Sequence, residues 1–213
     1  AFDVDNTHYY LNEIPFADHG ALLDPPTSDV TARCLALFTV LEDPQYEETV
    51  TRTLEYLRAE QEPNGSWFGR WGINYLYGTW SVLCALEMAG ESKDQPYIRR
   101  AADWLLSVQR PDGGWGEDNH SYFDPSLAGQ CKRSTSFQTA WAVLGLMAAG
   151  EVRSPAVREG IEHIQHTQLQ NGLWFDEEFT APGFPRVFYL KYHGYSDYFP
   201  LWALARYSKL TRD

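Results

Sequence analysis

The sequence predicts an all-α fold in which inner and outer helices alternate along part of a ring, an α/α toroid. Two observations predict it. A seven-residue pattern, Gln followed by Gly-x-Trp, occurs three times, each time directly after a helical run. Helices that are apolar on nearly all sides also alternate with amphipathic helices, as expected when inner helices are covered and outer helices face water. An open helical solenoid with the same units is the alternative, because the sequence does not show whether a ring closes.

The elements are predicted from their capping residues and breakers. Residues 1–27 carry Asn, Gly and Pro at spacings that forbid a continuous helix, which predicts a long loop. Ser28 or Asp29 is predicted to cap the first helix, which runs to about Leu41. Its expected buried face comprises Val30, Cys34, Leu37, Phe38 and Leu41. Further helices are predicted at 47–61, 79–89, 97–108, 136–149 and 155–167, with a last helical stretch that ends at 205.

The periodicity of these helices separates two layers. Helices 79–89 and 136–149 are apolar nearly all round and end at a glycine, which predicts inner helices. Helices 97–108 and 155–167 carry mixed and charged residues, which predicts outer helices. Loops are predicted at 111–133 and 171–187, where Gly, Asp, Asn and Pro gather.

Composition excludes several classes of partner. The chain has 213 residues, of which 44% are apolar and 15% aromatic, and its formal net charge is −12. This charge argues against a nucleic-acid partner and against a basic membrane-binding patch. No apolar run approaches the roughly 18 to 20 residues that span a bilayer. The three cysteines lack close spacing, which favours a reduced, intracellular protein; Cys34 and Cys84 are expected as buried thiols.

Residues 64–78, NGSWFGRWGINYLYG, form the stretch that stands out most, because glycines and aromatic rings are concentrated between two helices. This stretch resembles the signature of the squalene–hopene and oxidosqualene cyclases, and the Gln…Gly-x-Trp repeats resemble the QW motifs of that family. Residues 183–190 and the opening DVDNT resemble its bacterial squalene–hopene branch. One position departs: Asn64 stands where an acidic residue is usual.

The resemblance covers the whole chain and implies that residues 1–213 are the C-terminal part of an α/α-barrel catalytic domain. It implies a structural role for the repeats, in which Gln and Trp fasten helix ends to the next turn of the ring. These residues are Gln61, Trp67, Gln109, Trp115, Gln168 and Trp174.

The family's reaction needs a strong acid, a dry cavity and walls that stabilise carbocations. Aromatic faces suit the walls, because ring quadrupoles attract cations and are poor nucleophiles. By resemblance, the residues that line the cavity are Phe2, Phe16, Trp71, Tyr77, Phe184, Phe188, Leu190, Tyr192 and Tyr195.

The resemblance places the proton donor in an Asp-x-Asp-Asp motif, which this chain lacks, so the acid is expected upstream. Asp29 matches a position that supports the acid, and Arg33 matches one that is His in some members. An equally open interpretation makes Asp29 a helix cap in an ion pair with Arg33.

The implied function is cationic cyclisation of squalene to hopene or hopanol, with no metal or organic cofactor and no activity of this chain alone. The resemblance also implies a homodimer that attaches, as a peripheral or monotopic protein, to the cytoplasmic side of the cell membrane. Two alternatives stay open: a protein like the prenyltransferase β-subunits, which would need an Asp/Cys/His zinc site, and a non-catalytic α/α repeat module.

Overall fold

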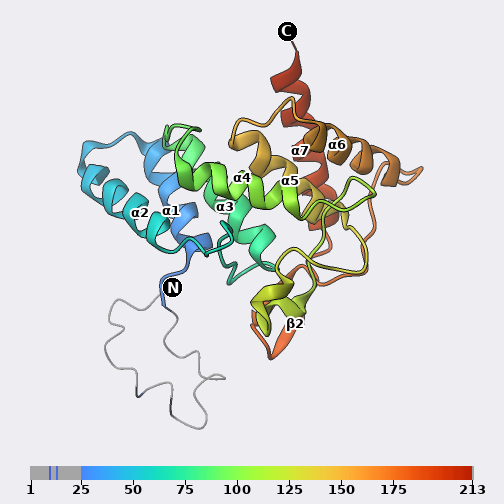
Figure 1. The fold of residues 1–213 in the computed structure, drawn as a ribbon, viewed down its shortest axis with the longest axis horizontal. Helices are drawn as coiled ribbons and strands as arrows, with labels where there is room; N and C mark the ends of the chain where they lie inside the picture. Colours follow the sequence, from blue (N-terminus) through green and yellow to red (C-terminus); the bar gives the residue numbers. More distant parts are fainter. Residues whose placement is uncertain (1–9, 11–12, 14–24, 213) are drawn as a thin grey trace.

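Seven α-helices dominate the part of the chain that the computed structural model describes, namely residues 10, 13 and 25–212 (Figure 1). Four of them pack in succession as an inner row: α1 (Ser28–Leu41), α3 (Tyr75–Met88), α5 (Ser136–Ala148) and α7 (Tyr195–Thr211). Three lie outside this row: α2 (Glu47–Ala59) against α1, α4 (Pro96–Ser107) against α3 and α5, and α6 (Pro155–Thr167) against α5 and α7. The predicted all-α arc of two layers is confirmed.

The core lies where the inner row is covered on both sides. All residues of α5 are buried, as its predominantly apolar sequence predicts. The indole rings of Trp67, Trp80, Trp115 and Trp141 are completely buried in the same core. In α4 and α6 only one face is buried, which confirms their prediction as outer helices.

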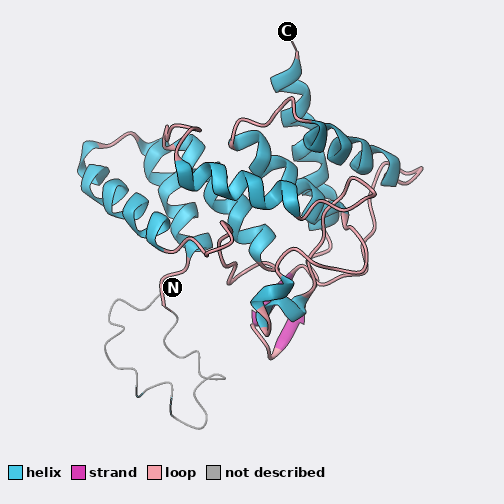
Figure 2. Cartoon of the chain, in the orientation of Figure 1, coloured by secondary structure: helices cyan, strands magenta, loops and turns pink. Residues whose placement is uncertain are grey.

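Short elements occupy the connections. Within residues 25–212 they are the 3₁₀ turns η3 (Pro44–Tyr46), η4 (Asn119–Tyr122) and η5 (Pro125–Leu127) and the antiparallel strands β1 (Ala181–Phe184) and β2 (Phe188–Leu190) (Figure 2). The hairpin is absent from the sequence prediction, which gives a loop over 171–187. Pro182 and Gly183 hide the strand pattern, and the hairpin is anchored by tertiary bonds that local sequence does not encode, such as the Ile73 N–H donating to the Thr180 carbonyl.

Two further predictions are corrected. Helix α3 begins at Tyr75 and not near 79, because the buried Glu117 carboxylate accepts the N–H of Leu76 and completes the helix start from another loop. In α1 the buried face comprises Ser28, Asp29, Ala32 and Leu35, which pack toward α3, while Leu37 and Leu41 are about half exposed.

The burial of the cysteines also differs from the sequence prediction. Cys34 is exposed, against expectation, since it lies off the α1 face that packs on α3; Cys84 is half-buried, and Cys131 likewise. All three are free thiols. None of the helices in the described ranges combines the length and apolarity that a bilayer crossing requires.

Candidate functional site

The signature segment, residues 64–78, is held by hydrogen bonds from two later parts of the chain, the loop that contains η4 and the start of the hairpin. The Tyr122 hydroxyl donates to the carbonyl oxygens of Gly69 and Gly72, at 2.7 and 2.9 Å. The Ile73 N–H donates to the Thr180 carbonyl at 3.2 Å. The loop that contains η4 and the hairpin therefore both set the shape of this segment.

A buried carboxylate supports the start of α3. Glu117, only 3% exposed, accepts the N–H of Leu76 at 2.8 Å and that of Asn74 at 3.3 Å. Burial raises the pKa of Glu117, opposed by the backbone N–H groups at the helix start. From α5, the Gln138 amide donates to the carbonyls of Ile73 and Glu117.

Trp71, Phe184 and Phe188 are here called the hairpin cluster; the guanidinium of Arg70 contacts the rings of Trp71 and Phe184, and Phe188 packs on Phe184. The central guanidinium carbon lies 4.2 Å from the Trp71 ring centroid and 5.8 Å from that of Phe184. One guanidinium nitrogen donates to the Gly183 carbonyl at 3.3 Å, and Arg70 is 7% exposed. Phe184 and Phe188 make an edge contact at 5.5 Å. The predicted wall residues of the signature and of the hairpin therefore meet.

A second set of rings, the helix cluster, comes from α3, α5 and α7. Tyr77 contacts Trp141 at 5.0 Å, and Trp80 stacks on Trp141 at 5.9 Å with an interplanar angle of 11°. Tyr195 meets Phe199 edge-on at 5.0 Å, and both contact Trp141. Predicted residues Tyr77 and Tyr195 thus belong to one continuous aromatic cluster, whose Trp80, Trp141 and Tyr77 are buried in the core.

Asp29 joins the start of α1 to the signature segment. Its carboxylate, in a residue 1% exposed, accepts from the Thr27 hydroxyl at 2.6 Å, from the Val30 N–H at 2.9 Å and from the Trp71 N–H at 2.8 Å. The hydrogen bond from the Trp71 N–H fixes the backbone of this predicted wall residue.

Arg33 does not pair with Asp29 in the described part of the chain, so the ion-pair interpretation is wrong. Its guanidinium lies 4.5 Å from the Trp80 ring centroid and 5.9 Å from that of Tyr77. Arg33 thus places a permanent cation against the helix cluster.

The predicted wall residues differ in exposure: Tyr77 is buried, Phe184 and Tyr195 are half-buried, and four others are exposed. Trp71, Phe188, Leu190 and Tyr192 are 39, 42, 37 and 46% exposed. Tyr192 packs on Tyr195 at 5.1 Å. The predicted residues Phe2 and Phe16 lie outside the described residues.

The repeat residues contact helix ends, as their pattern predicts. Each indole N–H donates to a carbonyl near the end of the preceding outer helix, where such groups lack partners inside the helix. The pairs are Trp67 to Leu57, Trp115 to Leu105 and Trp174 to Ile164, at 2.7, 2.7 and 2.8 Å. That these residues have no part in the chemistry stays a prediction.

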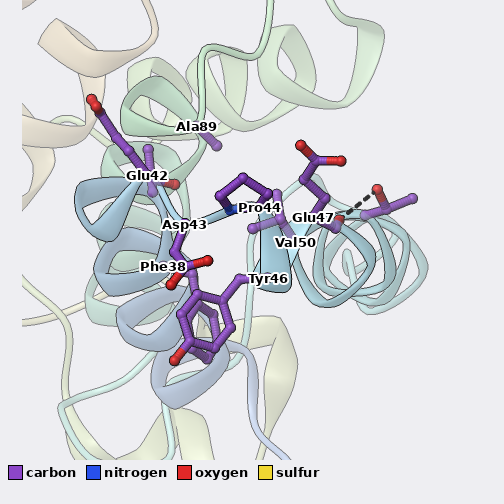
Figure 3. Close-up of a pocket in the computed structure, with 10 residues that line it drawn as sticks. Phe38, Glu42, Asp43, Pro44, Tyr46, Glu47, Val50 and Ala89 are labelled. Carbon is purple, nitrogen blue, oxygen red and sulfur yellow. Dashed lines mark hydrogen bonds between the residues drawn. The ribbon is translucent and has the colours of Figure 1, made fainter.

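A surface pocket of about 500 Å³ lies away from both clusters, between the end of α1, η3 and the start of α2 (Figure 3). Phe38 and Tyr46 stack there at 4.7 Å, and Glu42, Asp43 and Glu47 carry its charge. None of the predicted site residues lines it. Among the described residues, no group of three or more His, Cys, Asp or Glu side chains is arranged to hold a metal ion.

Several residues that position the site were not singled out from the sequence: Arg70, Glu117, Tyr122, Gln138 and Thr180. Arg70 lies inside the signature segment, directly before Trp71, so its position in the sequence could have identified it as a site residue. The other four act across 40 or more residues of sequence, as in the bonds from Glu117 and Tyr122 to the signature segment, and local pattern does not show such contacts.

Comparison with known proteins gives consistent matches. A family model described as the squalene-hopene cyclase C-terminal domain matches residues 1–209. The chain is 60% identical over 211 residues to a squalene–hopene cyclase of Bradyrhizobium diazoefficiens, covering 99% of this chain and 32% of that protein. It is 59% identical over 211 residues to a probable squalene–hopene cyclase of Sinorhizobium fredii, covering 99% of this chain and 33% of that protein.

A solved structure, the type II terpene cyclase MstE from Scytonema, matches with a TM-score of 0.55 at 26% identity, over 75% of this chain and 42% of that one. The chain spans about a third of the length of the curated relatives named above.

Proposed function

Because the chain belongs to the squalene–hopene cyclase C-terminal domain family, we propose that it forms one wall of a cavity in which squalene is cyclised to hopene or hopanol. A proton adds to the terminal double bond of squalene, and the positive charge moves along the carbon chain of squalene as each ring closes. Loss of a proton then gives hopene, and capture of water gives hopanol. The whole enzyme is longer than this chain and supplies the rest of the cavity.

The hairpin cluster is the observation that carries this proposal. Arg70 covers one face of Trp71, while Trp71 remains 39% exposed. The guanidinium therefore fixes the ring, and the exposed part of Trp71 is apolar surface that the substrate can contact. Phe184 also lies against the guanidinium, and Phe188 packs edge-on against Phe184 on the hairpin. Each ring face contributes about 0.5–2 kcal/mol toward a nearby cation.

The proton donor, in this proposal, lies outside the chain. Both oxygens of the Asp29 carboxylate already accept hydrogen bonds, one of them from the Trp71 N–H. Asp29 therefore fits the positioning of a wall segment. Arg33 carries hydrogen-bond donors and no acceptor, so it is unsuited to relay a proton. It acts as a fixed cation against the rings of α3.

The proposal also covers the membrane attachment and the oligomeric state of the whole enzyme. Squalene is apolar and partitions into bilayers, so the enzyme attaches to the cytoplasmic side of the cell membrane as a peripheral or monotopic homodimer. Co-sedimentation of the full-length protein with lipid vesicles and light scattering in detergent measure these two properties. A monomer that stays in the supernatant would contradict both.

The experiment uses the full-length protein that contains this chain, incubated with squalene and followed by gas chromatography with mass spectrometry. Wild type is expected to give pentacyclic products. Phe184→Ala or Phe188→Ala removes one ring face, which shifts the partition toward prematurely terminated polycycles by roughly 2- to 30-fold.

The matched control is Phe123→Ala, since Phe123 is 58% exposed and belongs to neither cluster. It should leave the product profile unchanged. Identical profiles for all three variants and wild type would remove the hairpin cluster from the mechanism. No turnover of squalene by the wild-type full-length protein would favour the non-catalytic repeat module.

A further inference from the structure

The loop that joins β1 to β2 contains a backbone conformation that side chains disfavour. This loop is residues 185–187, and Arg186 at its centre has a φ of 70°. In that left-handed region the Cβ of an L-residue crowds the following carbonyl oxygen, so glycine is the usual occupant. Among the described residues, the other non-glycine residue with a positive φ is Glu42, at the end of α1. An arginine in the hairpin loop therefore needs contacts that hold it there.

The Arg186 side chain makes such a contact. Its Nε–H donates to the carbonyl oxygen of Tyr122, in η4, at 2.7 Å. The Arg186 N–H also donates to the Tyr189 hydroxyl at 3.1 Å. The Tyr189 ring in turn lies 6.1 Å from the Tyr122 ring, centroid to centroid. The tip of the hairpin is thus fastened to the loop that contains η4.

Tyr122 extends this contact to the signature segment. The residue is 2% exposed, so its position in the fold is fixed by packing. Its hydroxyl donates to the carbonyls of Gly69 and Gly72, on either side of Trp71. Tyr122 therefore binds the hairpin through its backbone carbonyl and the signature segment through its side chain. A chain of hydrogen bonds runs from the hairpin tip to the backbone around Trp71.

The backbone of the hairpin also places its two phenylalanine rings. Phe184 and Phe188 are paired across the strands, and Arg186 stands midway between them in the sequence. The Phe188 ring lies directly on the backbone of Gly183, where an added Cβ would overlap it. Phe184 meets Phe188 edge-on at 5.5 Å. A movement of the hairpin tip would therefore move both rings relative to Trp71.

The hairpin is attached to the rest of the site at its base and at its tip. At the base, the Ile73 N–H donates to the Thr180 carbonyl, and Arg70 donates to the Gly183 carbonyl. At the tip, Arg186 adds its bond to the loop that contains η4. Attachment at the base alone leaves the strands free to pivot, whereas attachment at both ends fixes their orientation.

We propose that Arg186 is a positioning residue of the cyclisation, which sets the distance between the rings of the hairpin and that of Trp71. This inference rests on the proposed function, in which these rings face the growing cation. The attraction between a cation and a ring acts within about 6 Å of the ring centroid. When the tip is released, more of the intermediate cation loses a proton to water, forming a carbon–carbon double bond, before the last ring closes. Arg186 acts through the hairpin, without contact to the substrate.

The test compares the products that the full-length protein forms from squalene, by gas chromatography with mass spectrometry. Arg186→Ala removes the donor. The ratio of prematurely terminated to pentacyclic products should then rise roughly 2- to 10-fold. Arg186→Lys keeps a long side chain with donors, so it should recover part of the wild-type ratio. This ratio does not depend on how much of the enzyme is folded, which separates positioning from a loss of stability.

Arg186→Gly separates the backbone strain from the contact. Glycine adopts a φ of 70° at little cost, so this variant should melt at a higher temperature than Arg186→Ala. It also lacks the donor, so its product ratio should shift as far as that of Arg186→Ala. If Arg186 served stability alone, both variants would keep the wild-type ratio, and only their melting temperatures would differ.

The matched control is Arg158→Ala, which removes an arginine whose side chain is 60% exposed on the outer helix α6. It should keep the wild-type product ratio. If Arg186→Ala does not fold, Arg186→Gly and Arg186→Lys carry the comparison. An unchanged ratio in the Arg186 variants, with pentacyclic products from wild type, would overturn the positioning role and leave the proposed function in place. Absence of polycyclic products from wild type would overturn the proposed function, and this role with it.

Discussion

Replacing Arg70 tests whether a buried cation organises the hairpin cluster. In Arg70→Met the side chain keeps a similar length and loses its charge and its donors. The contacts of the Arg70 guanidinium in the described part of the chain include a close one with Trp71, a distant one with Phe184 and a hydrogen bond to the Gly183 carbonyl.

The expected cost follows from these contacts. A cation over a desolvated ring contributes up to about 2 kcal/mol, and the 5.8 Å contact with Phe184 is near the limit of the interaction. A hydrogen bond from a charged donor contributes about 1.5–3 kcal/mol, and its 3.3 Å length favours the low end. We therefore expect Arg70→Met to reduce the free energy of unfolding by about 2–4 kcal/mol.

The assay is urea denaturation of the full-length protein, combined with product analysis on squalene. Arg70→Lys keeps the charge without the planar fork, so it should recover part of the stability and of the wild-type product profile. The matched control is Arg58→Met, because Arg58 also lies over a ring, that of Tyr97 at 5.3 Å, but its side chain is 43% exposed. It should cost less than about 1 kcal/mol. Equal, small losses at both sites would refute the role given to burial.

Two further predictions concern Cys84 and Tyr122. Burial raises the pKa of the Cys84 thiol to about 11. At pH 8 a thiol reagent should therefore label the exposed Cys34 well before Cys84. Labelling of Cys84 should rise only as the pH approaches 11. Mass spectrometry of labelled peptides measures this, and equal rates at pH 8 would contradict it. Tyr122→Phe removes both hydrogen bonds to the signature segment and leaves two buried carbonyls without that donor, which should cost about 1–3 kcal/mol in urea denaturation. The matched control, Tyr198→Phe at a residue 71% exposed, should stay within about 0.5 kcal/mol of wild type.

Sequence periodicity was sufficient for the two layers of the fold. The apolar sequence of α5 leaves no face suited to water, and the amphipathic patterns of α4 and α6 leave one, so their depth in the arc follows from composition alone. The same reasoning failed for α1. Its apolar residues surround much of the helix, and only contact with α3 selects the face around Ala32 and Leu35.

For the candidate site, the sequence also predicted one part and missed another. Its aromatic members could be named from motifs, because rings at Gly-rich turns carry a recognisable pattern. Their arrangement could not, since the Trp71 backbone depends on the Asp29 carboxylate from α1 and the Trp71 ring on the guanidinium beside it.

By itself, the amino-acid sequence determined the helical class, the alternation of layers, the three repeated turns and the residue types of the wall. These properties follow from local periodicity and from side-chain chemistry, which neighbouring residues encode. Only the tertiary structure decided where α3 begins, that residues 181–190 form a hairpin, and that Arg70 joins two ring surfaces. Each depends on a buried polar group that meets its partner across a long stretch of chain, because a buried donor or acceptor must be satisfied by whatever the fold brings to it.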